Sequence, residues 1–246
     1  MKYLVVALCS LTLATSVLLV SFNFDACCEY LGLLAPEGVS ERPGVEHAQI
    51  EAALEDGAIP ESVRGIKLHQ PGGPVSLPDL DHQVREIDYA AAKFTVFVWV
   101  SALCPTSGIY EERLNALKSE FGSEVAFWAV NSDEMEKLPE LRSHFQRKEG
   151  PLKLTVLKDE GNVLADRWGA RVCPDVFVFN REGKLEYRGG VDDSRNPQEV
   201  RESYLREVLR SLLRGEKPRW RYQKANGCCP IDRVRPANAP QAAATK

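Results

Sequence analysis

The chain has 246 residues, of which 44% are hydrophobic and 27% charged, with 17 Gly and 15 Pro. These values exclude a collagen-like chain, a low-complexity disordered chain and a polytopic membrane protein. The formal net charge of −4 gives no general attraction for nucleic acid, so no nucleic-acid partner is expected. The seven cysteines are too few for a miniprotein built on disulfides, and each needs its own explanation: Cys9, Cys27, Cys28, Cys104, Cys173, Cys228 and Cys229.

The N-terminus begins with Met1-Lys2 and continues as an apolar run from Tyr3 to about Phe24. A short positive start before such a run is typical of a secretory signal. The run is also close to the roughly 20 residues that span a bilayer, which fits an uncleaved membrane anchor. We therefore expect residues 1–24 to be a signal peptide or an anchor. Either one places the protein as secreted, periplasmic or membrane-anchored, facing an oxidising, extracytoplasmic compartment.

The segments on either side of the central part of the chain have little to bury. Residues 25–60 are rich in Glu, Ala, Gly and Pro, and we expect a spacer there. The last residues read PANAPQAAATK, which predicts a disordered end to a C-terminal tail over 221–246 that carries the second cysteine pair. This leaves one domain over residues 61–220.

Strands and helices alternate along this domain. Two extended segments, 65–69 and 74–78, are joined by a Gln-Pro-Gly-Gly turn, which predicts a hairpin or a bent strand. Apolar and β-branched runs predict strands at 94–100, 125–130, 152–157, 175–179 and 184–188. Helical spacing of apolar residues, or polar helical character, predicts helices at 110–121, 134–148, 164–169 and 200–213. The alternation predicts an α/β domain with a central mixed sheet and helices on both faces.

Cys104 follows the buried strand 94–100 and precedes a predicted helix. A thiol in such a turn lies near free N–H groups and the positive end of the helix dipole, which favour the thiolate and lower the pKa. Such a cysteine can act as a nucleophile. A free cysteine at this place can equally be a small buried side chain that caps the helix.

Cys173 and Pro174 stand directly before the predicted strand 175–179. Proline cannot donate to a strand ladder and therefore sits at a strand start, where a cis peptide would form a tight turn. A trans proline that simply opens the strand is the alternative interpretation. The two cysteines gain significance from the order of the elements around them. A turn with a thiol is followed by a strand that begins with proline and then by a hairpin with a Gly turn.

Over about residues 60–220 the chain resembles the thioredoxin-like redoxins, in particular the branch of alkyl hydroperoxide reductases and thiol-specific antioxidant proteins. The most specific stretch runs from Trp168 to Ser194 and is similar to the family's cis-proline strand, hairpin and Arg-Gly-x-x-Asp-Asp segment. The resemblance implies a thioredoxin-like fold with Pro174 in the cis form beside the active thiol. Cys173 would then lie close to Cys104.

The pattern Ser101-x-x-Cys104-Pro105-Thr106 departs from the Cys-x-x-Cys of thioredoxins and looks like the Thr-x-x-Cys of peroxiredoxins, whose hydroxyl orients peroxide. Peroxiredoxins also have a proline where this chain has Phe97, and an arginine near the place of Pro174. Arg167 or Arg171 could replace that arginine only if the backbone turned it inward.

The resemblance implies a thiol-dependent oxidoreductase that reduces a disulfide or a peroxide and needs an external reductant but no cofactor. Cys104 would attack, helped by Ser101 or Thr106, and Cys173 would resolve the product. Copper or zinc binding by the thiols is a second interpretation. Related copper-handling redoxins add a histidine ligand, and none of the four histidines has a matching place: His47, His69, His82 and His144. A catalytically silent binding module is the third interpretation.

The vicinal pairs Cys27-Cys28 and Cys228-Cys229 flank the domain. Adjacent cysteines rarely bond to each other, so a disulfide between the two pairs would be the easier structural solution. An additional redox or metal pair, or free thiols, are the other interpretations.

Overall fold

The computed structural model describes residues 59–232. The predicted signal or anchor at residues 1–24, the Cys27-Cys28 pair and almost all of the spacer lie outside this range. Within residues 59–232, no helix combines the length and the apolar character needed to cross a membrane.

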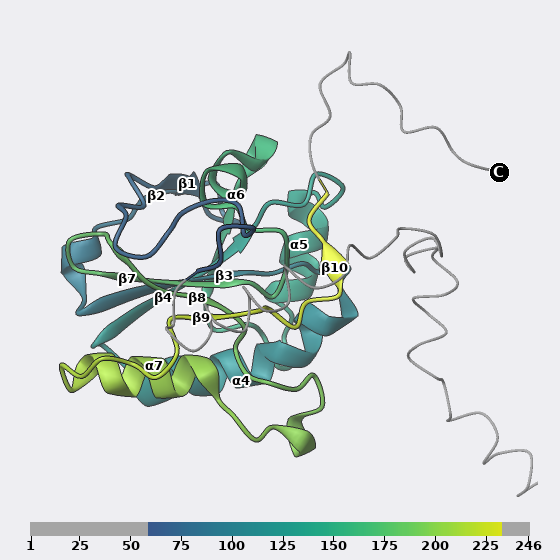
Figure 1. Ribbon diagram of the computed structural model, residues 1–246. Coiled ribbons are helices and arrows are strands. Elements are labelled where there is room, and N and C mark those ends of the chain that lie inside the picture. Colours follow the sequence, from purple (N-terminus) through teal and green to yellow (C-terminus); the bar gives the residue numbers. More distant parts are fainter. Residues whose placement is uncertain (1–58, 233–246) are drawn as a thin grey trace, which may run out of the picture. The chain divides into compact units, whose positions relative to one another are not determined.

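A six-stranded mixed sheet forms the centre of the domain (Figure 1). Its spatial order is β5 (Thr155–Lys158), β4 (Val125–Asn131), β3 (Phe94–Trp99), β7 (Val176–Asn180), β8 (Leu185–Gly189) and β9 (Tyr222–Gln223). β3, β4 and β5 are parallel to one another, β7 is antiparallel to β3 and β8, and β9 runs parallel to β8. Two short pairs lie outside this sheet, β1 (Ser76–Pro78) with β2 (Val84–Glu86), and β6 (Val172–Cys173) with β10 (Cys229–Pro230).

β3 lies inside the sheet because both of its faces are apolar. Val96 and Val98 contribute to one hydrophobic core, whereas Phe97 and Trp99 contribute to the other, and all four side chains are fully buried. This alternation follows from the two-residue period of a strand. It explains why a continuous apolar run, rather than an alternating one, marks this strand.

Helices cover both faces of the sheet (Figure 1). α4 (Pro105–Phe121), α5 (Leu138–Phe145) and α7 (Tyr204–Leu213) supply apolar side chains to the core that contains Val96 and Val98. α6 (Val163–Trp168) serves the opposite core, where Trp168 packs against Phe97 and Phe179. Three short 3-10 helices complete the elements of the described residues: η1 (Tyr89–Ala91), η2 (Glu160–Asn162) and η3 (Pro197–Glu199). The predicted α/β class, with a mixed sheet between helices, is confirmed.

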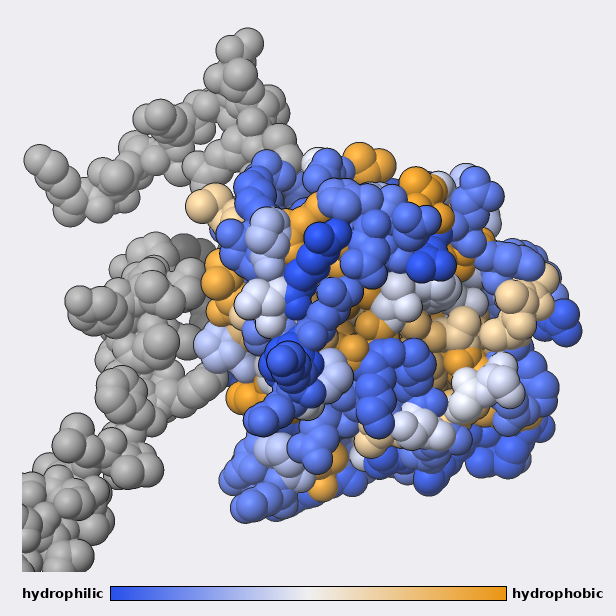
Figure 2. Space-filling model, turned by 180° about the vertical axis from the view of Figure 1, so that it is seen from behind, coloured by the Kyte–Doolittle hydropathy of each residue, from blue (hydrophilic) through white to orange (hydrophobic). Residues whose placement is uncertain are grey.

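The outer surface seen from behind the view of Figure 1 is mainly hydrophilic, with apolar residues in scattered patches (Figure 2). Large exposed hydrophobic side chains among the described residues include Val84, Leu103, Ile109, Met135 and Val163. Leu103 stands directly beside Cys104 in the chain and is 70% exposed.

Three predicted helices differ from the structure at their ends. The helix predicted to include Tyr110 begins already at Pro105, so Cys104 is its N-cap. The helix predicted over 134–148 is restricted to Leu138–Phe145. The helix predicted over 200–213 begins later, at Tyr204.

Of the two interpretations of 65–69 and 74–78, the hairpin is wrong. β1 pairs instead with β2, further along the chain. Residues 65–69 use their backbone groups elsewhere, because Ile66 N donates to Trp168 O at 3.2 Å and His69 N donates to Leu185 O at 2.7 Å. The segment therefore lies against the end of α6 and the start of β8.

The folded domain continues to residue 232, beyond the predicted boundary at residue 220. β9 extends the main sheet, and β10 pairs with β6 so that Cys229 lies opposite Cys173. Ile231 is buried in the same core as Trp168. The second cysteine pair is thus part of the fold and not of a free tail. The predicted disorder at residues 236–246 lies outside the described residues.

Candidate functional site

Cys104 lies at the junction of β3 and α4, as the sequence predicts. It is the N-cap of α4, and its sulfur accepts a hydrogen bond from Ser107 N at 3.4 Å. The residue is only 2% exposed. A backbone N–H at a helix N-terminus stabilises negative charge, so this contact favours the thiolate.

Cys173 lies beside Cys104, although 69 positions separate them in the sequence. The Cys173–Pro174 peptide bond is cis, as the resemblance implies. The Cys104 thiol donates to the backbone carbonyl of Cys173 at 3.7 Å. The thiol of Cys173 is itself buried, and Cys104, Cys173, Cys228 and Cys229 are all free.

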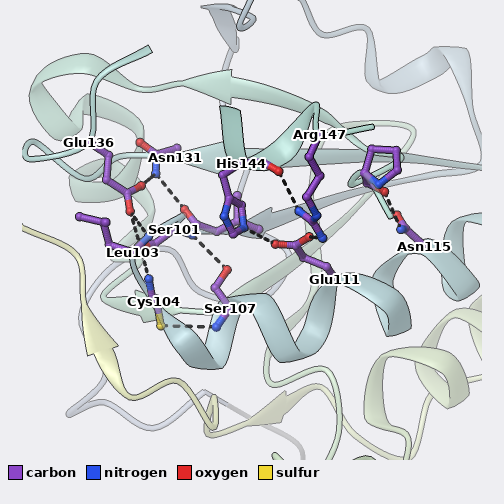
Figure 3. Close-up of polar contacts among 12 residues, drawn as sticks. Ser101, Leu103, Cys104, Ser107, Glu111, Asn115, Asn131, Glu136, His144 and Arg147 are labelled. Atoms are coloured by element: carbon purple, nitrogen blue, oxygen red, sulfur yellow. Dashed lines mark hydrogen bonds and ion pairs between the residues drawn. The ribbon is translucent and has the colours of Figure 1, made fainter. Parts of the chain in front are cut away.

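Ser101 positions the loop that carries Cys104 (Figure 3). Its hydroxyl accepts from Cys104 N at 3.0 Å and donates to Glu136 Oε1 at 2.7 Å. The same carboxylate oxygen accepts from Leu103 N at 2.7 Å. The Ser101 hydroxyl therefore contacts the Cys104 backbone and a carboxylate, and its structural role is to hold the turn.

Glu136 is the buried anchor of this turn. It is 1% exposed, and its second carboxylate oxygen accepts from Asn131 Nδ2. Lys158 Nζ donates to Asn131 Oδ1 at 2.7 Å and to Glu136 O at 3.0 Å. These three residues were not predicted, because a Glu in a polar stretch and polar residues at strand ends carry no sequence signal of burial.

The cysteine pair near the C-terminus completes the site. Thr106 Oγ1 lies 2.8 Å from the sulfur of Cys228, and that sulfur lies 3.3 Å from the sulfur of Cys229. The sulfurs of Cys104, Cys228 and Cys229 all lie within 4.8 Å of one another. Thr106 therefore contacts Cys228, and the structure brings together three thiols that the sequence places in separate groups.

Gly227 lets the C-terminal segment approach β6 closely. A Cβ at this position would lie 2.8 Å from Cys173 O and 2.8 Å from Val172 Cβ, closer than atoms of neighbouring residues pack. After the Cys228-Cys229 pair in the chain, Ile231 N donates to Arg171 O at 2.9 Å. In the sequence, Gly-Cys-Cys is the one pattern that indicates this close approach. It can be interpreted only when the segment is known to pack against β6.

Burial and hydrogen bonding shift the pKa values of the three thiols in different directions. Burial raises the pKa of Cys104, and the hydrogen bonds from Cys229 and Ser107 N offset this only in part. Burial also acts on Cys228, but hydrogen bonds from Thr106, Cys229 and Cys104 outweigh it and lower the pKa. Burial raises the pKa of Cys229. The expected low pKa of Cys104 is therefore not found, because desolvation exceeds the effect of the helix N-terminus.

The arginines considered as peroxiredoxin counterparts take other places. Arg167 donates to the carbonyl of Pro74 at 2.9 Å, and Arg171 is exposed. Of the described histidines, His144 contacts Glu111 at 2.6 Å and His69 contacts Arg221. The group of potential metal ligands found within residues 59–232 consists of thiols alone.

Fold and site together define the class: the chain has a thioredoxin-like fold, with a thiol at the strand–helix junction that contacts the carbonyl of the cis Cys173–Pro174 peptide. Residues 70–188, a little under half of the chain, match the model of the AhpC/TSA family. The predicted family is thus confirmed. The search of curated proteins found no match.

Two solved structures resemble the chain over most of its length. One is a hypothetical protein from Sinorhizobium meliloti 1021, which is 24% identical, with a TM-score of 0.63, covering 70% of this chain and 97% of that one. The other is an uncharacterized conserved protein from Geobacillus kaustophilus, which is 28% identical, with a TM-score of 0.60, covering 69% of this chain and 93% of that one. A secreted disulfide oxidoreductase from Mycobacterium tuberculosis is more distant, with 14% identity, a TM-score of 0.43 and coverage of 55% and 94%.

Proposed function

We propose that the protein is an extracytoplasmic thiol-dependent oxidoreductase that reduces a peroxide or a disulfide, with Cys104 as the nucleophile. One observation carries this proposal. The Cys104 sulfur caps α4 beside the cis Cys173–Pro174 peptide, with the sulfurs of Cys228 and Cys229 within 4.8 Å. A nucleophilic thiol with further thiols in reach is the arrangement that thiol–disulfide chemistry requires.

In the first step the Cys104 thiolate attacks an oxygen of a peroxide or a sulfur of a disulfide. Attack on a peroxide breaks the O–O bond, gives a sulfenic acid on Cys104 and releases an alcohol or water. Attack on a disulfide breaks the S–S bond and gives a mixed disulfide with one released thiolate. Ser107 N stabilises the attacking sulfur, while Ser101 and Glu136 hold the turn in place.

The resolving thiol proposed from the sequence is Cys173, and Pro174 would place it. The short path from the Cys104 sulfur to Cys173 supports this proposal. Full burial of Cys173, which raises the pKa of its thiol well above the ordinary value, opposes it. A thiol that is hard to ionise is a slow attacking group.

The extracytoplasmic location rests on residues 1–24, whose sequence is that of a signal peptide or a membrane anchor. The physiological partners would be a peroxide or a thiol/disulfide protein, together with an external reductant.

The three clustered sulfurs also support a second candidate function, the binding of a soft metal ion. Thiolate ligands select Cu(I), Zn(II) and iron–sulfur clusters. Structural Zn(II) takes four protein ligands, whereas three sulfurs are present within 4.8 Å here, which favours Cu(I). A silent binding module would use neither chemistry.

The test treats the reduced, purified chain with hydrogen peroxide or glutathione disulfide and follows Cys104 by mass spectrometry, with a dimedone trap for sulfenic acid. We expect modification of Cys104 in the native chain and in Cys173→Ser. Parallel anaerobic titration with Cu(I) separates the second candidate. An inert Cys104 with stoichiometric Cu(I) uptake that Cys104→Ser abolishes would replace the redox function by metal binding. An inert Cys104 without metal uptake would leave the binding module.

A further inference from the structure

We infer that Cys228 and Cys229, and not Cys173, form the resolving centre for Cys104 and the point at which an external dithiol delivers electrons. This inference rests on the proposed redox function. It assigns a role to a cysteine pair that begins 124 residues beyond Cys104 in the sequence and lies next to it in the fold.

The sulfur positions place the pair within reach of Cys104. The sulfurs of Cys104, Cys228 and Cys229 lie within 4.8 Å of one another, and those of Cys228 and Cys229 are 3.3 Å apart. Rotation of side chains from such distances brings the Cys104 sulfur to the length of a disulfide bond, about 2.05 Å, from either thiol of the pair, whereas a bond between the adjacent Cys228 and Cys229 also requires the backbone between them to distort. The contact of Cys104 with Cys173, by contrast, is made to a backbone carbonyl.

The pair is held in place from both sides. Before it, Asn226 Nδ2 donates to Asp192 O at 2.9 Å, and Cys229 itself lies in β10, which pairs with β6. After it, Ile231 is buried, and the carbonyl of Asp232 accepts from Asn162 Nδ2 at 3.0 Å. Contacts of this kind on both flanks keep the two thiols at Cys104.

Exposure divides the four thiols into two groups. Cys104 and Cys173 are each 2% exposed, whereas Cys228 and Cys229 are partly exposed. A small peroxide can reach a buried sulfur through local motion, but a protein dithiol needs room for its own sulfur in line with the bond it attacks. The partly exposed pair is therefore the place where a protein reductant can act.

The reaction balances in three internal steps. The Cys104 thiolate attacks the outer oxygen of a hydroperoxide ROOH; the S–O bond of a sulfenic acid forms, the O–O bond breaks, and the alkoxide leaves as ROH after taking a proton. The Cys228 thiolate then attacks the Cys104 sulfur; the S–S bond forms, the S–O bond breaks, and hydroxide leaves as water after taking a proton. The Cys229 thiolate next attacks the Cys228 sulfur, forming the Cys228–Cys229 disulfide and releasing Cys104 as a thiolate.

An external dithiol closes the cycle. Its first thiolate attacks the Cys228–Cys229 disulfide, which forms a mixed disulfide and releases one thiolate of the pair. Its second thiolate then attacks the dithiol's own sulfur in the mixed disulfide and releases the other thiolate of the pair. The pair returns to two thiols, and the dithiol leaves as a disulfide with the two electrons accounted for.

Thr106 identifies Cys228 as the first resolving thiol. Its hydroxyl lies 2.8 Å from the Cys228 sulfur, where an O–H donor stabilises a thiolate. Cys229 has no such hydroxyl contact among the described residues and acts second. The Thr106→Val variant should therefore slow loss of the sulfenic acid roughly tenfold.

The test oxidises the reduced full chain with one equivalent of hydrogen peroxide, alkylates the free thiols and maps tryptic peptides. Cleavage at lysine and arginine places Cys104 in peptide 94–113, Cys173 in 172–181 and the pair in 225–233. We expect peptide 225–233 to be unalkylated and two hydrogens lighter, because it contains the Cys228–Cys229 disulfide. Cys104 should be alkylated. In Cys229→Ser the reaction should stop at the Cys104–Cys228 disulfide, which links peptide 94–113 to peptide 225–233. Cys173→Ser tests the competing assignment of the resolving thiol and should still form the disulfide within peptide 225–233.

The outcomes separate the two proposals. If Cys104 forms a sulfenic acid and peptide 94–113 is then linked to 172–181, the resolving role of the C-terminal pair is wrong and the proposed function stands. Persistence of the sulfenic acid in Cys173→Ser, or undiminished resolution in a chain lacking both Cys228 and Cys229, leads to the same conclusion. If Cys104 reacts with neither oxidant, both proposals fall. Circular dichroism of each variant shows that the fold is retained.

Discussion

The sulfur of Cys228 lies 2.8 Å from the hydroxyl of Thr106, in the first turn of the helix that Cys104 caps. The N-terminus of α4 therefore carries Cys104 as its N-cap and contacts Cys228 through Thr106. The C-terminal segment is therefore part of the candidate site.

Gly227→Ala tests the close approach of this segment. The new Cβ would lie 2.8 Å from the carbonyl oxygen of Cys173, which is backbone and can yield only by moving β6 or β10. We expect a loss of about 1–3 kcal/mol in the free energy of unfolding, as for an overpacked site. Urea unfolding of the reduced protein measures it.

Gly108→Ala is the matched control for that variant. A Cβ at position 108 meets no atom within 4 Å, and the residue lies in α4. Alanine there should stabilise the helix by about 0.5–1 kcal/mol. Equal destabilisation by the two substitutions would contradict the role assigned to Gly227.

Glu136→Gln tests the anchor of the Cys104 turn. The carboxylate accepts from Ser101 Oγ, Leu103 N and Asn131 Nδ2, and an amide in its place turns one acceptor into a donor. We expect a loss of about 1–3 kcal/mol in unfolding free energy and slower oxidation of Cys104, because a buried donor is left without a partner.

Glu134→Gln serves as the comparison, since the Glu134 side chain is 44% exposed and pairs with exposed Lys137. Its stability should change by less than about 0.5 kcal/mol. If Glu136→Gln proves as mild as Glu134→Gln, the carboxylate does not anchor the turn.

The rate of Cys104 oxidation should depend on pH in a direction fixed by its neighbours. The thiolate is the reactive form, and burial raises the pKa of Cys104, so the rate should still increase above the ordinary thiol pKa of about 8.5. A chain lacking Cys229 should show a higher midpoint, because the Cys229 hydrogen bond lowers the pKa of Cys104. A chain lacking Cys228 should show a lower one, because the charge on Cys228 raises it.

The measurement is the initial rate of dimedone labelling at Cys104 from about pH 6 to about pH 10, within the range where thiols titrate. Opposite displacements of the midpoint in Cys228→Ser and Cys229→Ser support the assignment. Displacements of the same sign would show that the two thiols do not act differently on Cys104.

Asp175 gives a prediction on stability. Burial raises the pKa of its carboxyl to about 6 from the ordinary value of 3.8, and Arg188 offsets this only in part. The folded state therefore binds more protons than the unfolded state between these values, so this group's contribution to stability falls as the pH rises from about 4 to about 6. The full difference is on the order of 3 kcal/mol.

Urea unfolding at a series of pH values tests this, with Asp175→Asn for comparison. The native chain should lose stability over this interval relative to the variant. Parallel curves for the two proteins would rule out a raised pKa at Asp175.

Much of the fold could be predicted because local patterns report it directly. The apolar run from Phe94 to Val100 marks a strand buried on both faces, and the apolar spacing from Tyr110 to Phe121 marks the helix that follows, although the helix begins earlier, at Pro105. The cis-proline strand could be predicted by family resemblance. These signals lie within short stretches of sequence.

The rest of the site depends on contacts between distant segments. Cys228 meets Thr106 across 122 positions, and Glu136 meets Ser101 across 35. No local pattern distinguishes a cysteine pair that packs on β6 from one that ends a tail. A disulfide between the two flanking pairs, the alternative raised by the sequence, involves Cys27 and Cys28, which lie outside the described residues.

The reactivity of Cys104 is tested most directly in the full chain with Cys173, Cys228 and Cys229 replaced by serine. With hydrogen peroxide and dimedone, we predict one adduct per chain on peptide 94–113, and with glutathione disulfide one glutathione on the same peptide. Absence of both adducts from a folded chain would contradict the claim that Cys104 is the nucleophile.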